Sequence, residues 1–438
     1  MTENAIRTLD LTAGFELAKV NEIVPRASVD INQAVSAVLP LIDDVANRGA
    51  AAVVEVTLQR DGVNPEPLRV GQDELDAAAS ALEPELRRAI EESIARVRKV
   101  SRANLPQDTT VELAEGARVH QRWQPVDSVG LYVPGGKAVY PSSVIMNVVP
   151  AQEAKVQRLA IASPAQKDFG GRPHPTVLAT AALLGVTEVY SMGGPAAIAA
   201  FAYGLPQTAM PRVQLVTGPG NIYVAAAKRA LRGRIGIDSE AGTTEILVLA
   251  DDSADARLIA YDLVSQAEHD EAAASVLVTD SAELAVAVAR ELPAIVAVTR
   301  HSDRVRTALA GQQSAIVLVA DWDAAIAFSN EYATEHLEIH SREDRATLER
   351  ITNAGAIFLG KYSPVSLGDY MAGSSHVLPT GEQAKFGSGL GVHSFLRPQQ
   401  VIDYDQAGLE PIARLVAGFA EAEGLPAHGE AITARFDL

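Results

Sequence analysis

The chain has 438 residues, a formal net charge of −18 at pH 7 and no cysteine. The acidic balance argues against a nucleic-acid partner and against anionic membranes, because both are bound by basic surfaces. Without cysteine, disulfides, thiol nucleophiles and thiolate metal sites are excluded, so any metal must be held by imidazole, carboxylate or amide groups. No basic-then-apolar leader and no apolar run of membrane length is recognisable, so we expect a cytoplasmic protein.

The first 125 residues are rich in Ala, Glu, Arg and Leu, with dense charge and helical periodicity. This pattern predicts a solvated helical region, of which a helix over residues 73–99 is the clearest element.

From about residue 128 short apolar runs alternate with Ala-rich segments. The first series is "VGLYVPG", "RLAIASP", "EVYSMGG" and "VQLVTGPG", with helices expected at 143–153, 174–184, 195–203 and 221–231. The second series is "TEILVLAD", "SVLVTD", "AIVAV", "SAIVLVAD" and "GAIFLG". Apolar strands alternating with helices predict a parallel sheet covered on both faces, so two successive α/β units are expected.

The last sixty residues have no comparable strand series. A Gly-rich stretch, "GEQAKFGSGLGVHSFLR", is followed by a helical tail. Such a tail suits an arm that packs either on a neighbouring subunit or on its own chain.

Three glycine turns, at 131–143, 191–204 and 216–230, each join an apolar run to a helix. Backbone N–H groups at such helix starts favour anionic ligands, and three of them in one unit favour a nucleotide cleft. None is a G-x-G-x-x-G or P-loop motif, so tight turns without a ligand remain the alternative.

Several polar residues stand in patterns that suit a binding site. In "SQAEHD", Gln266 and His269 are three positions apart and share a helix face, which directs them to a metal, a substrate or solvent. In "EHLEIH", Glu335 and His336 are adjacent, and at a strand end both side chains can enter one cleft.

Two further stretches place polar groups in loops. "SLGDYMAGSSHVLPT" contains Asp369 and His376, and "AEAEGLPAHGE" contains Glu423 and His428, with solvated loop residues as the alternative for each. Together with the helix above they offer an N/O donor set without thiolate, which suits Zn²⁺ and leaves room for substrate donors.

Six motifs in this order and spacing resemble the histidinol dehydrogenase family: "GLYVPGG", "GPGN", "SQAEHD", "EHLEI", "GDYMAGSSHVLPT" and "AEAEGLPAH". The resemblance runs from about residue 20 to the C-terminus. It implies two NAD-dependent steps that oxidise L-histidinol through L-histidinal to L-histidine, the last steps of histidine biosynthesis.

The implied fold is α/β, with two incomplete Rossmann-like parallel-sheet domains, an N-terminal helical segment and a C-terminal helical arm. The first domain would comprise residues 1–127 and 239–378, the inserted NAD-binding domain 128–238, and the dimerisation arm 379–438. The arm would be exchanged within a zinc-containing homodimer.

The resemblance also implies roles for individual residues. The expected zinc ligands are Gln266, His269, Asp369 and His428. Glu335 would activate water and His336 would accept protons. Substrate contacts are expected from the zinc ligands and from Thr244, His336, His376 and Glu423, with Glu423 and His428 completing the partner subunit's site. NAD contacts are expected at Tyr132, Ala196 and Asn221.

Two positions depart from the family pattern. Thr244 in "AGTTE" replaces a serine of "AGPSE", which retains the hydroxyl group. Ala196 in "GGPAA" replaces a glutamine of "GGAQA", which removes a side-chain contact to NAD.

The expected mechanism follows the chemistry of a primary alcohol that becomes an acid. Zinc would position the substrate, and His336 would take the hydroxyl proton. The aldehyde must then be hydrated, with Glu335 as the base. A metal-dependent hydrolase is the alternative, but it needs no nucleotide and leaves the three glycine turns unexplained. A two-lobed binding protein is a third possibility, but its usual periplasmic role needs an export signal, and none is recognisable.

Overall fold

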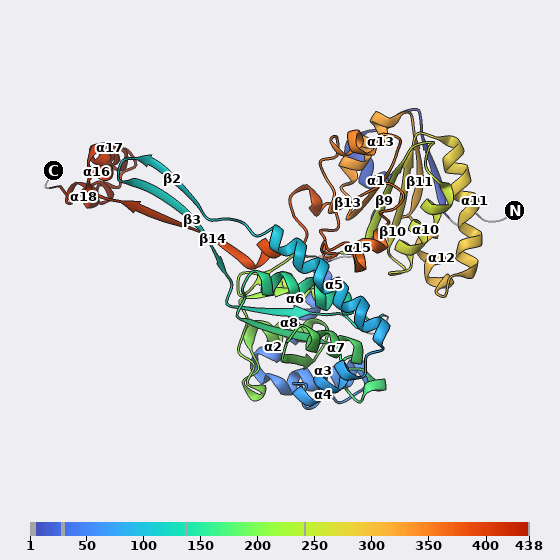
Figure 1. Cartoon of the computed structure of the whole chain (residues 1–438), viewed down its shortest axis with the longest axis horizontal. Coiled ribbons are helices and arrows are strands. Elements are labelled where there is room, and N and C mark those ends of the chain that lie inside the picture. The colour runs from blue at the N-terminus through green and yellow to red at the C-terminus, as the bar shows by residue number, and fades with distance from the viewer. Residues whose placement is uncertain (1–5, 28–30, 136–137, 241, 437–438) are drawn as a thin grey trace.

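The computed structural model describes residues 6–27, 31–135, 138–240 and 242–436 (Figure 1). Gly136 and Lys137 of the first glycine turn lie outside the described residues. Within the described ranges, no helix combines the length and the apolar character that crossing a bilayer requires.

One α/β unit is built on a six-stranded sheet in the order β1-β11-β10-β9-β12-β13, with all neighbours parallel. Its strands are β1 Arg7–Leu11, β9 Glu245–Ala250, β10 Ala274–Thr279, β11 Ala315–Val319, β12 His336–His340 and β13 Ala356–Leu359. Its helices are α1 Val20–Ile23, α10 Ala256–Ala267, α11 Ala282–Val298, α12 Ser302–Ala310, α13 Trp322–Tyr332, α14 Asp344–Leu348 and α15 Val365–Tyr370. The central strands are apolar on both faces because helices cover both sides.

The other α/β unit has a five-stranded parallel sheet in the order β6-β5-β4-β7-β8. Its strands are β4 Ser128–Tyr132, β5 Arg158–Ser163, β6 Glu188–Ser191, β7 Leu215–Thr217 and β8 Gly236–Ile237. The intervening helices are α6 Pro141–Glu153, α7 Pro175–Leu183, α8 Gly194–Tyr203 and α9 Ile222–Leu231. These confirm the expected helices, and the two parallel units confirm the expected fold class.

The N-terminal helices contact the helices of the five-stranded unit. They are α2 Ile31–Arg48, α3 Ala50–Asp61, α4 Gln72–Ser80 and α5 Pro84–Ala103. Helix α2 contacts α8 and α9, α4 contacts α7, and α5 contacts α6. The domain limits expected from the sequence stay a prediction.

An arm extends away from both units (Figure 1). It contains an antiparallel sheet in the order β14-β3-β2, formed by β2 Thr109–Ala114, β3 Ala117–Pro125 and β14 Leu396–Tyr404. At its far end lie α16 Gln406–Leu409, α17 Ala413–Ala422 and α18 Pro426–Thr433. The arm is thus helical only at its tip.

Three local expectations are wrong. The first 125 residues, expected to be helical, also contain the strands β1, β2 and β3. The single helix over 73–99 is two helices, because Pro84 begins α5 and a proline cannot continue the preceding helix. The run "AIVAV" at 294–298 is not a strand but the end of α11, where one apolar face packs on the core. A short apolar run does not by itself distinguish a buried helix from a strand.

Candidate active site

The acid–base pair of the sequence analysis lies at the start of β12, beside β9. Glu335 precedes the strand and His336 is its first residue. The backbone N–H of Glu245 donates to Glu335 Oε2 at 3.0 Å, and the Glu245 carbonyl oxygen lies 3.1 Å from His336 Nδ1. One residue of β9 therefore orients both members of the pair.

The bond to the Glu245 carbonyl decides which nitrogen of His336 can act as a base. A carbonyl only accepts, so Nδ1 must carry the hydrogen, and Nε2 keeps its lone pair. Burial lowers the pKa of His336, and the nearby Asp369 opposes this shift. At neutral pH the ring is therefore uncharged and ready to accept a proton at Nε2.

Glu335 is held by two hydrogen bonds to the same oxygen. Besides the Glu245 amide, the Thr244 hydroxyl donates to Oε2 at 2.6 Å. Burial nevertheless raises the pKa of Glu335 to about 8, against these bonds, which stabilise the charged form. Gly355 directly precedes β13 and lies beside Glu335, which precedes β12. A Cβ at Gly355 would lie only 2.5 Å from the Glu335 carbonyl oxygen, so the backbone approaches closely here.

Gln266 continues the same chain of contacts. Its Nε2 donates to the Thr244 hydroxyl oxygen at 2.7 Å, and its side chain is fully buried near the end of α10. Its Oε1 has no hydrogen-bond partner among the described residues. A buried carbonyl oxygen without a partner is costly unless a ligand or ion satisfies it. The amide is thus fixed with its oxygen available as a metal donor.

His269 and Asp369 supply two more donors. His269 Nδ1 lies 3.3 Å from the Gln266 backbone oxygen, which leaves Nε2 for a metal. That nitrogen is 3.8 Å from Asp369 Oδ2. Ligands at about 2.1 Å from one ion are separated by at most about 4.2 Å, so this pair fits a shared Zn²⁺. The donors of Gln266, His269 and Asp369 therefore suit the metal expected from the sequence.

His376 connects the two α/β units. Its Nδ1 lies 3.2 Å from the Asp369 carbonyl oxygen, and its Nε2 lies 3.2 Å from the hydroxyl oxygen of Ser143 in α6. Burial lowers its pKa, so the ring is neutral at neutral pH. Sequence reasoning did not identify Ser143 or Glu245. The sequence signal for Glu245 was a carboxylate at the start of an otherwise apolar run. The structure shows that this buried carboxylate forms an ion pair with Arg26.

The arm residues do not join this site within one chain. Glu423 directly follows α17 and His428 lies in α18, both exposed, and Figure 1 places these helices at the far end of the arm. The expected contribution of both residues to a second subunit stays a prediction.

The expected NAD contacts lie at the carboxyl ends of the five-stranded sheet. Tyr132 ends β4, and its hydroxyl oxygen accepts the Gly194 N–H at 3.1 Å; burial raises its pKa to about 12. The Asn221 side chain caps α9 by accepting from two backbone amides, and Ala196 is 2% exposed in α8. Gly218 has φ of +116°, and a Cβ there would lie 2.0 Å from the Tyr132 carbonyl oxygen, so this turn requires glycine.

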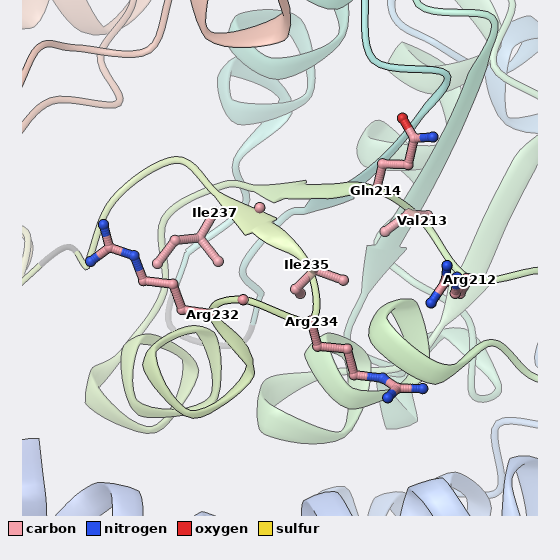
Figure 2. Close-up of a pocket in the computed structure, with 9 residues that line it drawn as sticks. Arg212, Val213, Gln214, Arg232, Arg234, Ile235 and Ile237 are labelled. Carbon is pink, nitrogen blue, oxygen red and sulfur yellow. The ribbon is translucent and has the colours of Figure 1, made fainter. Parts of the chain in front are cut away.

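A cavity of about 570 Å³ lies elsewhere, beside β7 and β8 (Figure 2). It is lined by three arginines, Arg212, Arg232 and Arg234, with neighbouring residues of 213–214 and 233–237. None of the predicted site residues lines it. The candidate site is therefore defined by its polar contacts rather than by this hollow.

Two parallel sheets, one ending in glycine turns and the other carrying a buried, oriented base, are the arrangement expected of a nucleotide-dependent dehydrogenase. The family model for histidinol dehydrogenase matches residues 24–436. Histidinol dehydrogenase of Leifsonia xyli subsp. xyli is 58% identical over 415 residues, 95% of each chain, and that of Thermobifida fusca is 56% identical over 412 residues, 94% of each chain.

The same family appears among solved structures. The crystal structure of histidinol dehydrogenase from Elizabethkingia anophelis matches with a TM-score of 0.93 at 30% identity, covering 100% of this chain and 99% of that one. The chain belongs to the histidinol dehydrogenase family, and so to the NAD-dependent oxidoreductases. The hydrolase considered as an alternative is not supported.

Proposed function

We propose that the protein oxidises L-histidinol through L-histidinal to L-histidine with two NAD⁺, as the last steps of histidine biosynthesis. The observation that carries the proposal is a pair of hydrogen bonds to one residue: the Glu245 N–H binds Glu335, and the Glu245 carbonyl oxygen binds His336. These hydrogen bonds hold two bases side by side, His336 for the alcohol and Glu335 for the water. The cytoplasmic location stays an expectation from the sequence.

The two bases have different tasks in this reaction. His336 Nε2 takes the proton of the substrate hydroxyl as the alcohol is oxidised, and it is uncharged for this purpose at neutral pH. The aldehyde must then add water, because only a tetrahedral carbon can be oxidised again by loss of hydride. Glu335 takes a proton from that water, and its Oε1 serves, since Oε2 already accepts two hydrogen bonds.

Zinc and NAD supply what the side chains cannot. When bound, zinc would hold nitrogens of the substrate and so position its reacting carbon, while NAD⁺ would accept the electrons. Gln266, His269 and Asp369 would bind the metal from one chain. We place NAD at the carboxyl ends of the five-stranded sheet, by Tyr132 and Asn221.

We further propose a homodimer in which the arm is exchanged. The arm exposes large apolar side chains, among them Ile402 at 72%, Leu415 at 71% and Phe419 at 70%. Leu415 and Phe419 lie one turn apart on α17, and exposed apolar surface of this kind indicates an interface. On exchange, His428 would complete the metal site of the second copy, and Glu423 would bind the positively charged substrate there.

The proposal is tested by stoichiometry. Purified protein supplied with limiting L-histidinol and excess NAD⁺ is expected to form about two NADH per substrate, since both oxidations occur in one site. The absorbance of NADH and the amount of histidine are measured. One NADH per substrate, with accumulating aldehyde, would contradict the two-step reaction.

Thr244→Val is expected to weaken zinc binding by about 10–100-fold, because the hydroxyl that fixes the Gln266 amide and donates to Glu335 is removed. Thr244→Ser keeps this hydroxyl and is the matched control, with affinity close to that of the original chain. Competition with a chromophoric chelator measures both. Equal affinities for the Val and Ser variants would show that the hydroxyl does not position the ligand.

A further inference from the structure

A buried polar cluster outside the catalytic pair joins α10 to β12. It consists of Asp262, Glu338 and His340, and one donor atom of each lies within 4.8 Å of the others. His340 Nε2 is 3.2 Å from Glu338 Oε2, and the carboxyl groups of Asp262 and Glu338 are hydrogen-bonded. Glu338 is 0% exposed.

Glu338 also reaches a third element. Its Oε1 accepts the backbone N–H of Val365 at 2.7 Å, the first residue of α15. The residue before the helix is Pro364, whose side chain cannot accept this hydrogen bond. The start of α15 is therefore attached to β12 through a single buried carboxyl group.

The cluster is satisfied by its own hydrogen bonds. Asp262 donates a hydrogen bond to Glu338, because a carboxyl group that lies beside another carboxyl group keeps its proton more readily. Burial, reinforced by Glu338, raises the pKa of Asp262 to about 8. The cluster therefore joins structural elements and has no need of an ion.

Each joined element carries a residue of the candidate site at a short, regular spacing. Asp262 lies one helical turn before Gln266 in α10, and Val365 one turn before Asp369 in α15. Glu338 lies two residues after His336 in β12, on the same face of the strand. One turn of helix therefore separates the cluster from the donors Gln266 and Asp369, and two strand residues separate Glu338 from the base His336.

We propose that Glu338 is a positioning residue for the zinc site. Its bonds to Asp262 and to the Val365 amide hold α10 and α15 in register with β12. The separation of Gln266 and Asp369, which lie on those helices, then depends on it. This inference rests on the zinc site of the proposed function.

The test compares Glu338→Met with Glu338→Gln in the full-length protein. Met has similar volume but accepts neither hydrogen bond, so zinc affinity is expected to fall by about 10–100-fold. Gln retains an oxygen for the Val365 N–H, and its NH₂ group can hydrogen-bond to the Asp262 carboxyl group, so affinity should stay within about threefold. Chelator competition measures affinity, and the visible spectrum of the Co²⁺-loaded protein reports the geometry of the ligands.

Two further comparisons separate positioning from general destabilisation. Ile42→Ala removes a buried side chain of α2, which packs on α8 and α9 of the five-stranded unit, and should lower Tm without changing zinc affinity or the Co²⁺ spectrum. If Glu338→Met does not fold, the half-buried Asp262 provides a second pair. Asp262→Ala should weaken zinc binding, and Asp262→Asn should restore it.

The outcomes are distinct. Weakened zinc binding and an altered spectrum in Glu338→Met, with Glu338→Gln and Ile42→Ala resembling the original chain, support the proposal. Unchanged affinity despite a lower Tm overturns it, as does loss of a second zinc equivalent, which would make the cluster itself a metal site. If His269→Ala does not affect zinc binding in the otherwise original chain, the zinc site of the proposed function fails, and the proposal with it.

Discussion

Glu335→Gln is expected to slow the complete conversion of L-histidinol to L-histidine by about 10²–10⁴-fold, the usual contribution of a general base. The reason is that an amide cannot take the proton of the water that adds to the aldehyde. The side chain keeps its size and one oxygen to accept from Thr244 and Glu245, so the site keeps its shape.

The effect should fall on one step. Oxidation of the alcohol depends on His336 and should continue, and pre-formed aldehyde hydrate should still be oxidised. Stopped-flow NADH absorbance with histidinol, and with aldehyde hydrate, measures the two steps. Glu349→Gln, an exposed position of the same unit, is the matched control. Collapse of alcohol oxidation in Glu335→Gln would show that the two bases are wrongly assigned.

The pH profile offers an independent readout of Glu335. Burial raises its pKa to about 8, so the carboxylate that acts as the base forms only as the pH rises through that value. The hydration step should therefore speed up between about pH 7 and 9. Burial lowers the pKa of His336, so that ring is already neutral and adds no limb in this range. Glu335→Gln should lack this limb.

His428→Ala should abolish activity, and mixing this variant with Glu335→Gln should restore part of it. The variant loses an expected zinc ligand that lies on the arm, far from its own chain's site. If the arm is exchanged, a hybrid dimer with Glu335→Gln contains one site with both residues intact. Activity is measured here as histidine formation, which Glu335→Gln also nearly loses. After subunit exchange, an equal mixture of the two variants should recover about a quarter of the original rate of histidine formation, since half of the dimers are hybrids with one good site.

The mixture experiment has its controls in the same design. Each variant alone, taken through the same exchange, should remain inactive. A mixture of Glu335→Gln with His269→Ala should stay inactive in either arrangement if neither residue crosses between subunits: each chain of the hybrid then lacks a residue of its own site. No recovery with His428→Ala would indicate that the arm serves its own chain or that His428 is not a ligand.

Prediction from sequence succeeded where the information is local. The helix at 221–231 and the strand "TEILVLAD" have periodicities that neighbouring residues determine, and the structure confirms both. It failed where a short run such as "AIVAV" suits two structures, because only packing on the core selects between them. The antiparallel pairing of β3 with β14 was not expected, since these strands are far apart in sequence.

For the site, the sequence showed which kinds of side chain are available as metal ligands and bases. The sequence alone excluded thiolates, offered histidine, carboxylate and amide donors, and placed Glu335 next to His336. Those facts are independent of folding, because they concern the chemistry of the side chains. The motif order also indicated the family, which the comparisons then showed.

Only the tertiary structure decided how these groups act. The pairing of β9 with β12 brings Glu245 to residues 90 and 91 positions away, which makes Nε2 the basic nitrogen of His336 and buries Glu335 enough to raise its pKa. The same packing leaves Gln266 Oε1 without a partner. Protonation state and donor availability depend on burial and on hydrogen-bond partners from distant segments, and sequence spacing contains neither.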